Sequence, residues 1–511
     1  MKVSSPRGVD RILTVTLNRI RGASRIFPPS TIAIRPVEVL TSSVTGIGLL
    51  VIFGLALRLY HYLRGPSLWH DEAALVINVV QKGFGELLGP LLFSEAAPPL
   101  FLWLERAVVL LLGDGVNALR LVPLAASCLG LLLLVPLARH CLAPASVGWA
   151  ILLFGCSDRL LWHACEAKQY SVEACLAVAQ LVLYFQTAAW PLARRLVLFA
   201  FLAPATLWLA YPGCFLYGAL LLVYLTEVRK ARSPAAWMAY GLLIAAVFGS
   251  FAMLVAGPMQ AQCDQTIVDC WQGMRQFPDW RRPASVPLWT LQSTFDLVGY
   301  VCKPVGKVLA PLAVVGIIAL WRRGARDVLL LLLVPIGLAY VASCFHSYPY
   351  GGMRVMVYAS PAIVMLVAAG VPPSLDWLKA KRPIAAIALT VLLLVPLARA
   401  AYYVVVPWPR ANCAAAADYV TLARLPSDPV VSNHWEYVYY FRGLGAAHLP
   451  METHAPLTEG RVWVVVTGAT PAERKPCLDL YQAGDWQTRE RREFERTTVL
   501  LVEKQPSTML R

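Results

Sequence analysis

The sequence predicts an all-α polytopic membrane bundle of about eleven transmembrane helices, followed by a small C-terminal α/β domain. Of the 511 residues, 58% are hydrophobic and only 15% are charged, and the mean hydropathy is +0.59, values that ordinary soluble domains do not reach. The apolar residues also come in blocks of roughly 16 to 22, the length a helix needs to cross about 30 Å of hydrocarbon.

Eleven apolar blocks are expected to span the membrane. They begin near residues 44, 118, 146, 172, 196, 213, 236, 306, 327, 355 and 384. A further apolar stretch, residues 98–113, carries Glu105 and Arg106 in its middle. Because a charge pair at the bilayer centre is costly, we interpret this stretch as an interfacial or re-entrant helix in the first outside loop.

The distribution of basic residues sets the expected orientation. With eleven spans, five basic clusters all fall on the cytoplasmic side, as the positive-inside bias requires; twelve spans would place all five outside. The clusters lie at residues 139, 194–195, 229–232, 322–326 and 379–382. We therefore expect a multi-pass protein of the plasma (inner) membrane, with a cytoplasmic leader at residues 1–43 and a transmembrane domain at 44–402. Its main outside loops are 61–117, 258–303 and 346–352.

The tail, residues 403–511, is expected outside the membrane as a small α/β domain. Three short apolar runs at 428–432, 461–467 and 497–503 read as buried strands, and residues 414–425 and 471–483 read as helices. Two cysteine pairs could form disulfides in that compartment, Cys263 with Cys270 and Cys413 with Cys477, although spacing alone does not show either bond.

The net charge of +15 raises the question of a nucleic-acid partner. Such a partner needs a basic stripe with interleaved aromatic residues on a soluble face. Here the Lys and Arg residues lie in short clusters between apolar blocks, where they match anionic membrane lipids. We expect no nucleic-acid partner.

Polar residues from several outside segments should meet at one membrane surface. Asp71 and Glu72 follow the first span, in SLWHDEAALVINVV; by themselves they could simply cap a helix. Three further segments bring polar residues to the same side, and together they predict a polar site at the boundary between water and membrane. These segments supply Glu95, then Glu166, Lys168 and Tyr170, then His346, Tyr348 and Arg354.

In these motifs the chain resembles the GT-C superfamily of membrane glycosyltransferases, especially the protein O-mannosyltransferase and lipid A aminoarabinose transferase branch. The resemblance covers about the first 370 residues in order and spacing. Its motifs are the DE pair at 71–72, the acid before PPL (Glu95, Pro98, Pro99), the EAxxY turn from Glu166 to Tyr170, and the YPYGGMR turn from Tyr348 to Arg354. Lys168-Gln169 stands where these relatives often have Arg-Pro, and Ala97 where they often have His or Lys.

The resemblance implies transfer of a sugar from a polyprenyl-phosphate carrier to an acceptor on the outer face of the membrane. Asp71 would match the family's catalytic acid and Glu166 its second acidic position. The chemistry agrees, because a sugar phosphate already has a stable leaving group and one carboxylate could suffice as general base, with inversion. Glu72 and Glu166 are the alternative bases.

The remaining predicted residues would bind the donor or line its cavity. Arg354, Lys168 and Tyr348 are the predicted phosphate-binding residues, although Arg354 could also be an arginine that snorkels to the interface. Glu95, His346 and Tyr170 would line a cavity that opens outward, with an apolar groove leading sideways into the bilayer. Glu95 and His346 could also hold a divalent metal, but a lone interfacial His is more often a hydrogen-bonding residue, so no metal site is assigned.

Two other functions fit parts of the pattern. A transporter or flippase of lipid-linked sugars would place ionisable residues near the midplane, often in pseudo-repeated halves; here they lie in loops at one surface, and no repeat is seen. A catalytically silent scaffold would not need acids to converge with Arg354. The sequence leaves the sugar and the acceptor open, and the acceptor could be a protein, a glycan or a lipid.

Overall fold

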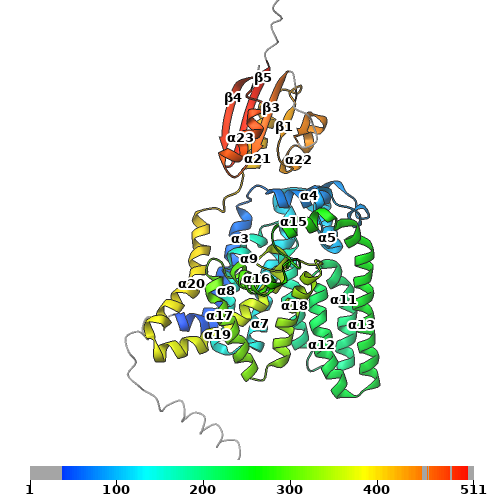
Figure 1. Ribbon diagram of the computed structural model, residues 1–511, viewed down its shortest axis with the longest axis vertical. Coiled ribbons are helices and arrows are strands. Elements are labelled where there is room, and N and C mark those ends of the chain that lie inside the picture. The colour runs from blue at the N-terminus through cyan, green and yellow to red at the C-terminus, as the bar shows by residue number, and fades with distance from the viewer. Residues whose placement is uncertain (1–36, 452–456, 458–459, 484–485, 505–511) are drawn as a thin grey trace, which may run out of the picture.

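The protein, described by a computed structural model for residues 37–451, 457, 460–483 and 486–504, is mostly helical. The predicted cytoplasmic leader lies almost entirely outside the described residues. A helical bundle occupies the chain up to Val405, and a small sheet domain sits above one end of it (Figure 1). The two parts are joined by residues 406–412.

Within the described residues, seven helical segments are long and apolar enough to cross a membrane. They are α3 (Val44–Leu63), α7 (Leu121–Cys141), α11 (Leu192–Leu209), α13 with its short continuation (Pro234–Gln262), α18 (Arg326–Cys344), η5 with α19 (Arg354–Lys381) and α20 (Pro383–Val405). Helices α16 (Val286–Val301) and α17 (Gly306–Arg322) meet at a bend of 103° and could form an eighth, broken span. The chain is therefore a multi-pass membrane protein.

The other expected spans are helices that are short or charged. Helix α8 (Pro144–Gly155) and helix α10 (Tyr170–Gln186) have fewer than 18 residues, and α12 (Gly213–Ala231) carries Glu227, Arg229 and Lys230 near its end. Ten of the 12 residues of α8 and 12 of the 17 residues of α10 are buried, so protein packing accounts for their apolar character as well as lipid would. The count of eleven spans thus stays a prediction.

The segment predicted as the first outside loop, residues 61–117, folds largely into short helices at the end of the bundle that faces the sheet domain (Figure 1). The two longer ones are α4 (His70–Gln81) and α5 (Pro99–Leu112). Helix α5 contains the charge pair at 105–106: Glu105 is buried, and Arg106 donates to the carbonyls of Val79 and Val80 at the end of α4. The charges therefore face protein, and the interfacial or re-entrant position of this helix stays a prediction. The remaining short elements of the bundle are η1 (Glu86–Leu88), η2 (Leu92–Ser94), α6 (Val116–Leu119), α9 (Asp158–Ala164), η3 (Val255–Met259), α14 (Gln260–Gln262), α15 (Gln265–Gly273) and η4 (Pro283–Ser285).

The C-terminal domain is a five-stranded mixed sheet with helices on both faces. Its strands are β1 (Val430–Ser432), β2 (His448–Pro450), β3 (Arg461–Thr467), β4 (Trp486–Phe494) and β5 (Thr497–Lys504), in the order β2-β1-β3-β5-β4. Strand β1 runs parallel to β2 and β3, whereas β5 runs antiparallel to β3 and β4. Helices α21 (Cys413–Ala423) and α22 (Glu436–Tyr440), followed by η6 (Arg442–Ala447), pack on one face; α23 (Pro471–Asp479) packs on the other.

The three apolar strands and two helices predicted in this tail are confirmed. Alternate residues of β3 explain the arrangement: Trp463 and Val465 pack toward α21 and α22, while Val462 and Val464 pack toward α23. Both faces are therefore buried, and the strand reads as a continuous apolar run. Strand β4 was not predicted, because its sequence WQTRERREF is charged and exposed on an edge of the sheet.

All twelve cysteines lie in the described part of the chain and are free. Cys263 and Cys270 are exposed near and within α15. Cys413 is buried at the start of α21, and Cys477 is half-buried in α23 on the opposite face of the sheet. Neither candidate disulfide is present.

Candidate active site

Four charged side chains from four segments of the helical bundle lie in contact with one another. Oδ1 of Asp71 lies 2.8 Å from Nη2 of Arg354, and its Oδ2 lies 3.7 Å from Nζ of Lys168. Lys168 in turn donates to both carboxylate oxygens of Glu95 at 2.8 Å. Two acids and two cations thus form a charge-balanced cluster, which we call the Asp71 cluster.

Local sequence explains how these side chains are presented. Asp71 is the second residue of α4, and the following Glu72 accepts a hydrogen bond from the backbone N–H of Trp69, which precedes the helix. Arg354 begins η5, and only Met353 separates it from Gly351 and Gly352. A Cβ on Gly352 would lie 2.3 Å from the carbonyl oxygen of Asp296, and Gly351 has a φ of +139°, so this turn requires glycine.

One oxygen of Asp71 has no hydrogen-bond partner. The side chain is only 9% exposed, and within the described residues no group donates a hydrogen bond to its Oδ2. Lys168 at 3.7 Å is beyond hydrogen-bonding distance. An unsatisfied carboxylate oxygen is costly when buried, and it is the feature expected of a group that accepts a proton from a bound substrate.

Glu166 belongs to a chain of hydrogen bonds beside this cluster. Its Oε1 accepts from the indole N–H of Trp69 at 2.9 Å, and its Oε2 lies 2.5 Å from Nδ1 of His163. The other ring nitrogen of His163 lies 2.8 Å from the hydroxyl of Tyr300. The ring of Tyr170 packs edge-on against His163. Both oxygens of Glu166 are therefore occupied, whereas Oδ2 of Asp71 has no donor among the described residues.

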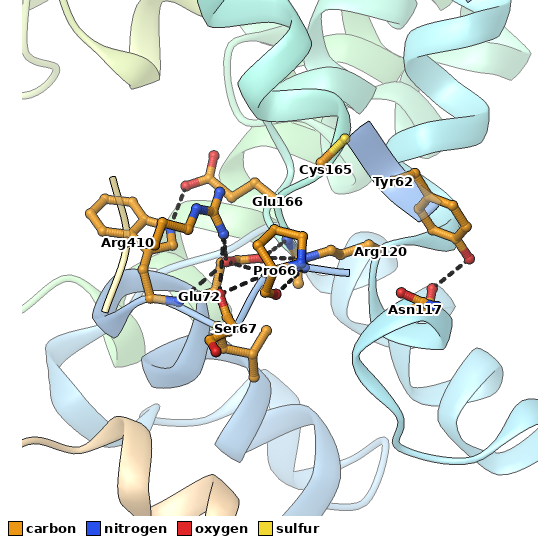
Figure 2. A network of polar contacts seen from close by, with 12 residues as sticks. Tyr62, Pro66, Ser67, Glu72, Asn117, Arg120, Cys165, Glu166 and Arg410 are labelled. Carbon is orange, nitrogen blue, oxygen red and sulfur yellow. Dashed lines mark hydrogen bonds and ion pairs between the residues drawn. The ribbon is translucent and has the colours of Figure 1, made fainter. Parts of the chain in front are cut away.

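Glu72, the neighbour of Asp71 in the chain, lies in a buried network of polar contacts (Figure 2). Arg120 binds both of its oxygens at 2.8 Å, and Arg410 binds Oε2 at 2.8 Å. The backbone N–H of Ala167 adds a bond at 2.9 Å to Oε1. With the bond from Trp69, five donors hold this carboxylate, so the geometry favours a structural role for Glu72 over that of a base.

The pKa values of these carboxyls follow their surroundings. Burial alone would raise the pKa of Glu72, but the charges of Arg120 and Arg410 and the bonds from Arg120 and Ala167 outweigh it, so the pKa lies below its ordinary value. Burial raises the pKa of Glu95; Lys168 opposes this effect and the charge of Asp71 adds to it. Glu72 is thus held firmly as a carboxylate.

A cavity of about 620 Å³ opens between the membrane bundle and the sheet domain. Glu166, Arg354 and Tyr300 line it from the bundle, Arg410 from the connecting segment, and Glu436 from the sheet domain. Its volume is typical of small-molecule sites. Trp69 and Trp271 lie on the two sides of Arg354, with ring centroids 6.0 and 5.7 Å from the guanidinium carbon. The cavity therefore offers a cation among aromatic faces.

A second cavity of about 630 Å³ adjoins the first and shares part of its wall. Arg159 and Tyr300 line both, and Lys303 and Lys307 line the second alone. Asp296 is the acidic residue in this second lining and pairs with Lys307. The site thus has room for two ligands, with cations along both compartments.

Two predicted residues lie apart from the Asp71 cluster. His346 packs against Phe277 and lines a separate cavity. The hydroxyl of Tyr348 donates to the carbonyl of Val355 at 2.6 Å, and its ring packs against Phe215. These contacts favour structural roles for both. In the described residues, no group of three or more His, Cys, Asp or Glu side chains could hold a metal ion.

The sequence interpretation did not single out several residues of the site. His163 stands three residues before Glu166, a spacing that places both on one face of a helical turn, and this signal could have found it. Arg120 and Arg410 had no local signal, because their partner Glu72 is 48 and 338 residues away in the chain.

Comparison with solved structures identifies the fold of this chain. No family model and no curated protein matches the chain. Among solved structures, ArnT (lipid A aminoarabinose transferase) from Cupriavidus metallidurans in its apo state aligns over 89% of this chain and 98% of its own, with a TM-score of 0.51 at 14% identity. The same ArnT bound to undecaprenyl phosphate aligns over 90% and 98%, with a TM-score of 0.52 at 13% identity. The chain has a GT-C fold.

This GT-C fold confirms the resemblance expected from the four motifs. The archaeal oligosaccharyltransferase from Archaeoglobus fulgidus is a more distant likeness, with 11% identity, a TM-score of 0.47, and coverage of 79% of this chain and 64% of its own. At such identities the comparison establishes the GT-C fold alone. The roles of the individual site residues stay predictions.

Proposed function

We propose that this protein is an inverting glycosyltransferase that moves a sugar from a polyprenyl-phosphate donor to an acceptor on the extracytoplasmic face of the membrane. The observation that carries the proposal is the state of Asp71: one oxygen is paired with Arg354, and the other is buried with no hydrogen-bond partner in the part of the chain that the structure describes. A base and a phosphate-binding cation in contact are what such a transfer needs.

The donor is the substrate that this site fits best. ArnT, which has the same fold, is known in a form bound to undecaprenyl phosphate, which supports a polyprenyl-linked donor. A polyprenyl tail must stay in lipid, because exposing it to water costs about 0.8 kcal/mol per CH₂. The phosphate would then lie at Arg354, at the end of a membrane helix, with the sugar in the cavity lined by Trp69 and Trp271.

The chemical step balances with these residues alone. Asp71 Oδ2 takes the proton from the acceptor nucleophile, whose lone pair forms a bond to the anomeric carbon. The bond between that carbon and the phosphate oxygen breaks, and its electron pair leaves with the polyprenyl phosphate. Arg354 neutralises the phosphate, with Lys168 as a second cation behind Asp71. Attack opposite to the leaving group inverts the anomeric centre.

The adjoining cavity would take the acceptor. A transferase of this kind has to hold two substrates at once, one on each side of the reacting carbon. The shared wall at Arg159 and Tyr300 lets the two compartments meet. The acceptor itself, whether protein, glycan or lipid, is left open.

Purified full-length protein in lipid nanodiscs, given undecaprenyl-phosphate donors carrying a labelled sugar, tests the proposal. Membrane extract from the producing cells supplies acceptors, and the readout is label transferred from the donor together with free undecaprenyl phosphate. We expect transfer by the wild type and none by Asp71→Asn. Movement of intact donor across the bilayer without bond cleavage would identify a flippase instead, and binding without either would identify a scaffold.

A further inference from the structure

We propose that the C-terminal domain is a positioning part of the active site, because Arg410 and Tyr440 hold the turn at residues 67–72 that carries Asp71. The inference rests on the proposed function of Asp71 and deepens it. A domain that merely covered the site or recruited a partner would not need bonds to this particular turn. Four of the six residues in the turn are bonded to the C-terminal domain or to the segment that leads into it.

Two backbone groups shortly before Asp71 are held from the sheet domain. The N–H of Leu68 donates to the hydroxyl of Tyr440 at 2.8 Å. The indole N–H of Trp435 donates to the carbonyl of His70 at 2.5 Å. Leu68 is fully buried, so without Tyr440 its N–H would need another partner. The residues that lead up to Asp71 are thus held by α22 and by Trp435, which directly precedes that helix in the sheet domain.

The start of the turn is fixed by the connecting segment. The hydroxyl of Ser67 donates to the side-chain oxygen of Asn412 at 3.2 Å and accepts from the backbone N–H of Ala414 at 3.2 Å. Asn412 is also the N-cap of α21, where its side chain accepts from the N–H of Ala415. The same side chain therefore anchors the first helix of the C-terminal domain and the turn of the bundle.

Arg410 forms hydrogen bonds with the residues at both ends of the turn, Ser67 and Glu72. Its Nη1 donates to Oε2 of Glu72 at 2.8 Å and to the carbonyl of Ser67 at 3.4 Å, and its guanidinium stacks on Trp162 at 4.0 Å from the ring centroid. Figure 2 shows Arg410 and Arg120 approaching Glu72 together. Arg120 comes from the bundle and Arg410 from the connecting segment. Glu72 therefore links the bundle to the segment that leads into the C-terminal domain.

This link through Glu72 fixes the position of Asp71, because Glu72 directly follows Asp71 at the start of α4. Glu72 also caps that helix by accepting from the N–H of Trp69. Rotating or shifting its carboxylate would turn the first helical turn and move Asp71 relative to Arg354. A displacement of about 1 Å in a reacting group can cost on the order of 100-fold in rate.

The same domain interface supplies a matched control away from the turn. Arg442 pairs with Asp114 at 2.7 Å, and the hydroxyl of Tyr439 donates to the carbonyl of Asp114 at 2.6 Å. These contacts join the sheet domain to the loop before α6. They contribute to docking but do not touch residues 67–72. Loss of docking and loss of positioning can therefore be separated.

The test compares Arg410→Met, Arg410→Lys and Tyr440→Phe with the control Arg442→Met in full-length protein, assayed with labelled undecaprenyl-phosphate sugar as above. We expect kcat to fall about 10- to 100-fold in Arg410→Met and Tyr440→Phe, with the donor KM within about threefold of wild type. Arg410→Lys should recover part of the rate, because an ammonium can still bind Glu72. Arg442→Met should stay within about threefold in both constants.

Hydrogen exchange of the same proteins provides a readout that does not depend on activity. Peptides covering residues 67–72 should exchange at least tenfold faster in Arg410→Met and Tyr440→Phe than in wild type, while peptides from β3 and β5 stay protected. Equal protection of the turn in all variants would overturn the inference, as would equal loss of kcat in Arg442→Met. If Asp71→Asn kept full activity, the proposed role of Asp71 as the base would fail, whereas the exchange result would still decide whether the C-terminal domain holds the turn.

Discussion

Asp71 and Arg354 form a contact of 2.8 Å, and Arg354 also lines the cavity between the bundle and the sheet domain. The Asp71 cluster contains two acids and two cations. Beside it, the carboxylate of Glu72 is bound by Arg120 and Arg410 (Figure 2). A donor phosphate would add negative charge to a balanced cluster, so Arg354 would have to serve both the phosphate and Asp71.

Replacing Asp71 tests the role of the base. We expect Asp71→Asn to lower transfer by about 100-fold to 10,000-fold, the usual effect of losing a general base. Folding should be retained, because Asn is isosteric and can keep one bond to Arg354. Asp269→Asn, an exposed acid on α15, is the control and should behave as wild type. Retained activity in Asp71→Asn would direct attention to Glu166.

Replacing Arg354 tests the phosphate site. A hydrogen bond to a charged group contributes about 1.5–3 kcal/mol, so Arg354→Met should weaken donor binding by about 10- to 100-fold. Arg354→Lys keeps the charge but loses the planar guanidinium. Its affinity for the donor should therefore lie between those of the wild type and Arg354→Met. Binding of undecaprenyl phosphate, measured by microscale thermophoresis in detergent, checks this directly. Equal affinity in all three proteins would show that the phosphate binds elsewhere.

The sequence predicted the cluster but not the network beside it, for a physical reason. Asp71, Glu95, Lys168 and Arg354 each lie in a short polar segment between apolar blocks, and membrane topology alone brings such segments to one surface. Arg410 lies in the segment between two domains, and its partner is 338 residues distant. Sequence patterns carry no signal for a contact that depends on how two domains dock.

The helices also show where prediction from the sequence reaches its limit. Hydropathy identified α8 and α10 as spans, but their apolar faces are almost wholly covered by neighbouring helices. A helix buried inside a bundle and a helix in lipid have the same composition, so only the length of a helix indicates whether it can cross the membrane. Helix α8 has only 12 residues. In the tail, β3 was predicted because both faces are buried, whereas the charged edge strand β4 was not.

Cysteine labelling tests the orientation. Single cysteines at Ala235, at the start of α13, and at Leu422, which is 88% exposed on α21, should be labelled from opposite sides of intact cells by a membrane-impermeant maleimide. The background protein carries Cys263→Ser and Cys270→Ser, because these two are exposed. Basic residues near Ala235 favour the cytoplasmic side for that position. Labelling of both positions from the same side would rule out the eleven-span arrangement.

The buried charge network predicts a specific dependence of stability on pH. Glu72→Gln leaves Arg120 and Arg410 buried without a counter-charge, which should destabilise the protein by about 3–5 kcal/mol at neutral pH. The folded pKa of Glu72 lies below its ordinary value of 4.5, so the native state binds fewer protons than the unfolded state. The stabilisation is therefore present above about pH 4.5 and is lost as pH falls through the folded pKa.

Thermal unfolding in detergent, followed from pH 7 to pH 3, checks this sign. The difference in Tm between wild type and Glu72→Gln should be largest at neutral pH and should shrink on acidification, because the wild type loses its carboxylate while the variant has none to lose. Glu105→Gln is the matched control: Glu105 is equally buried, but neither of its oxygens has a hydrogen-bond partner in the described structure. No ion pair is broken there, so its Tm should stay close to wild type at neutral pH. A constant Tm difference for Glu72→Gln across the range would mean that Glu72 is not held as a carboxylate by the two arginines.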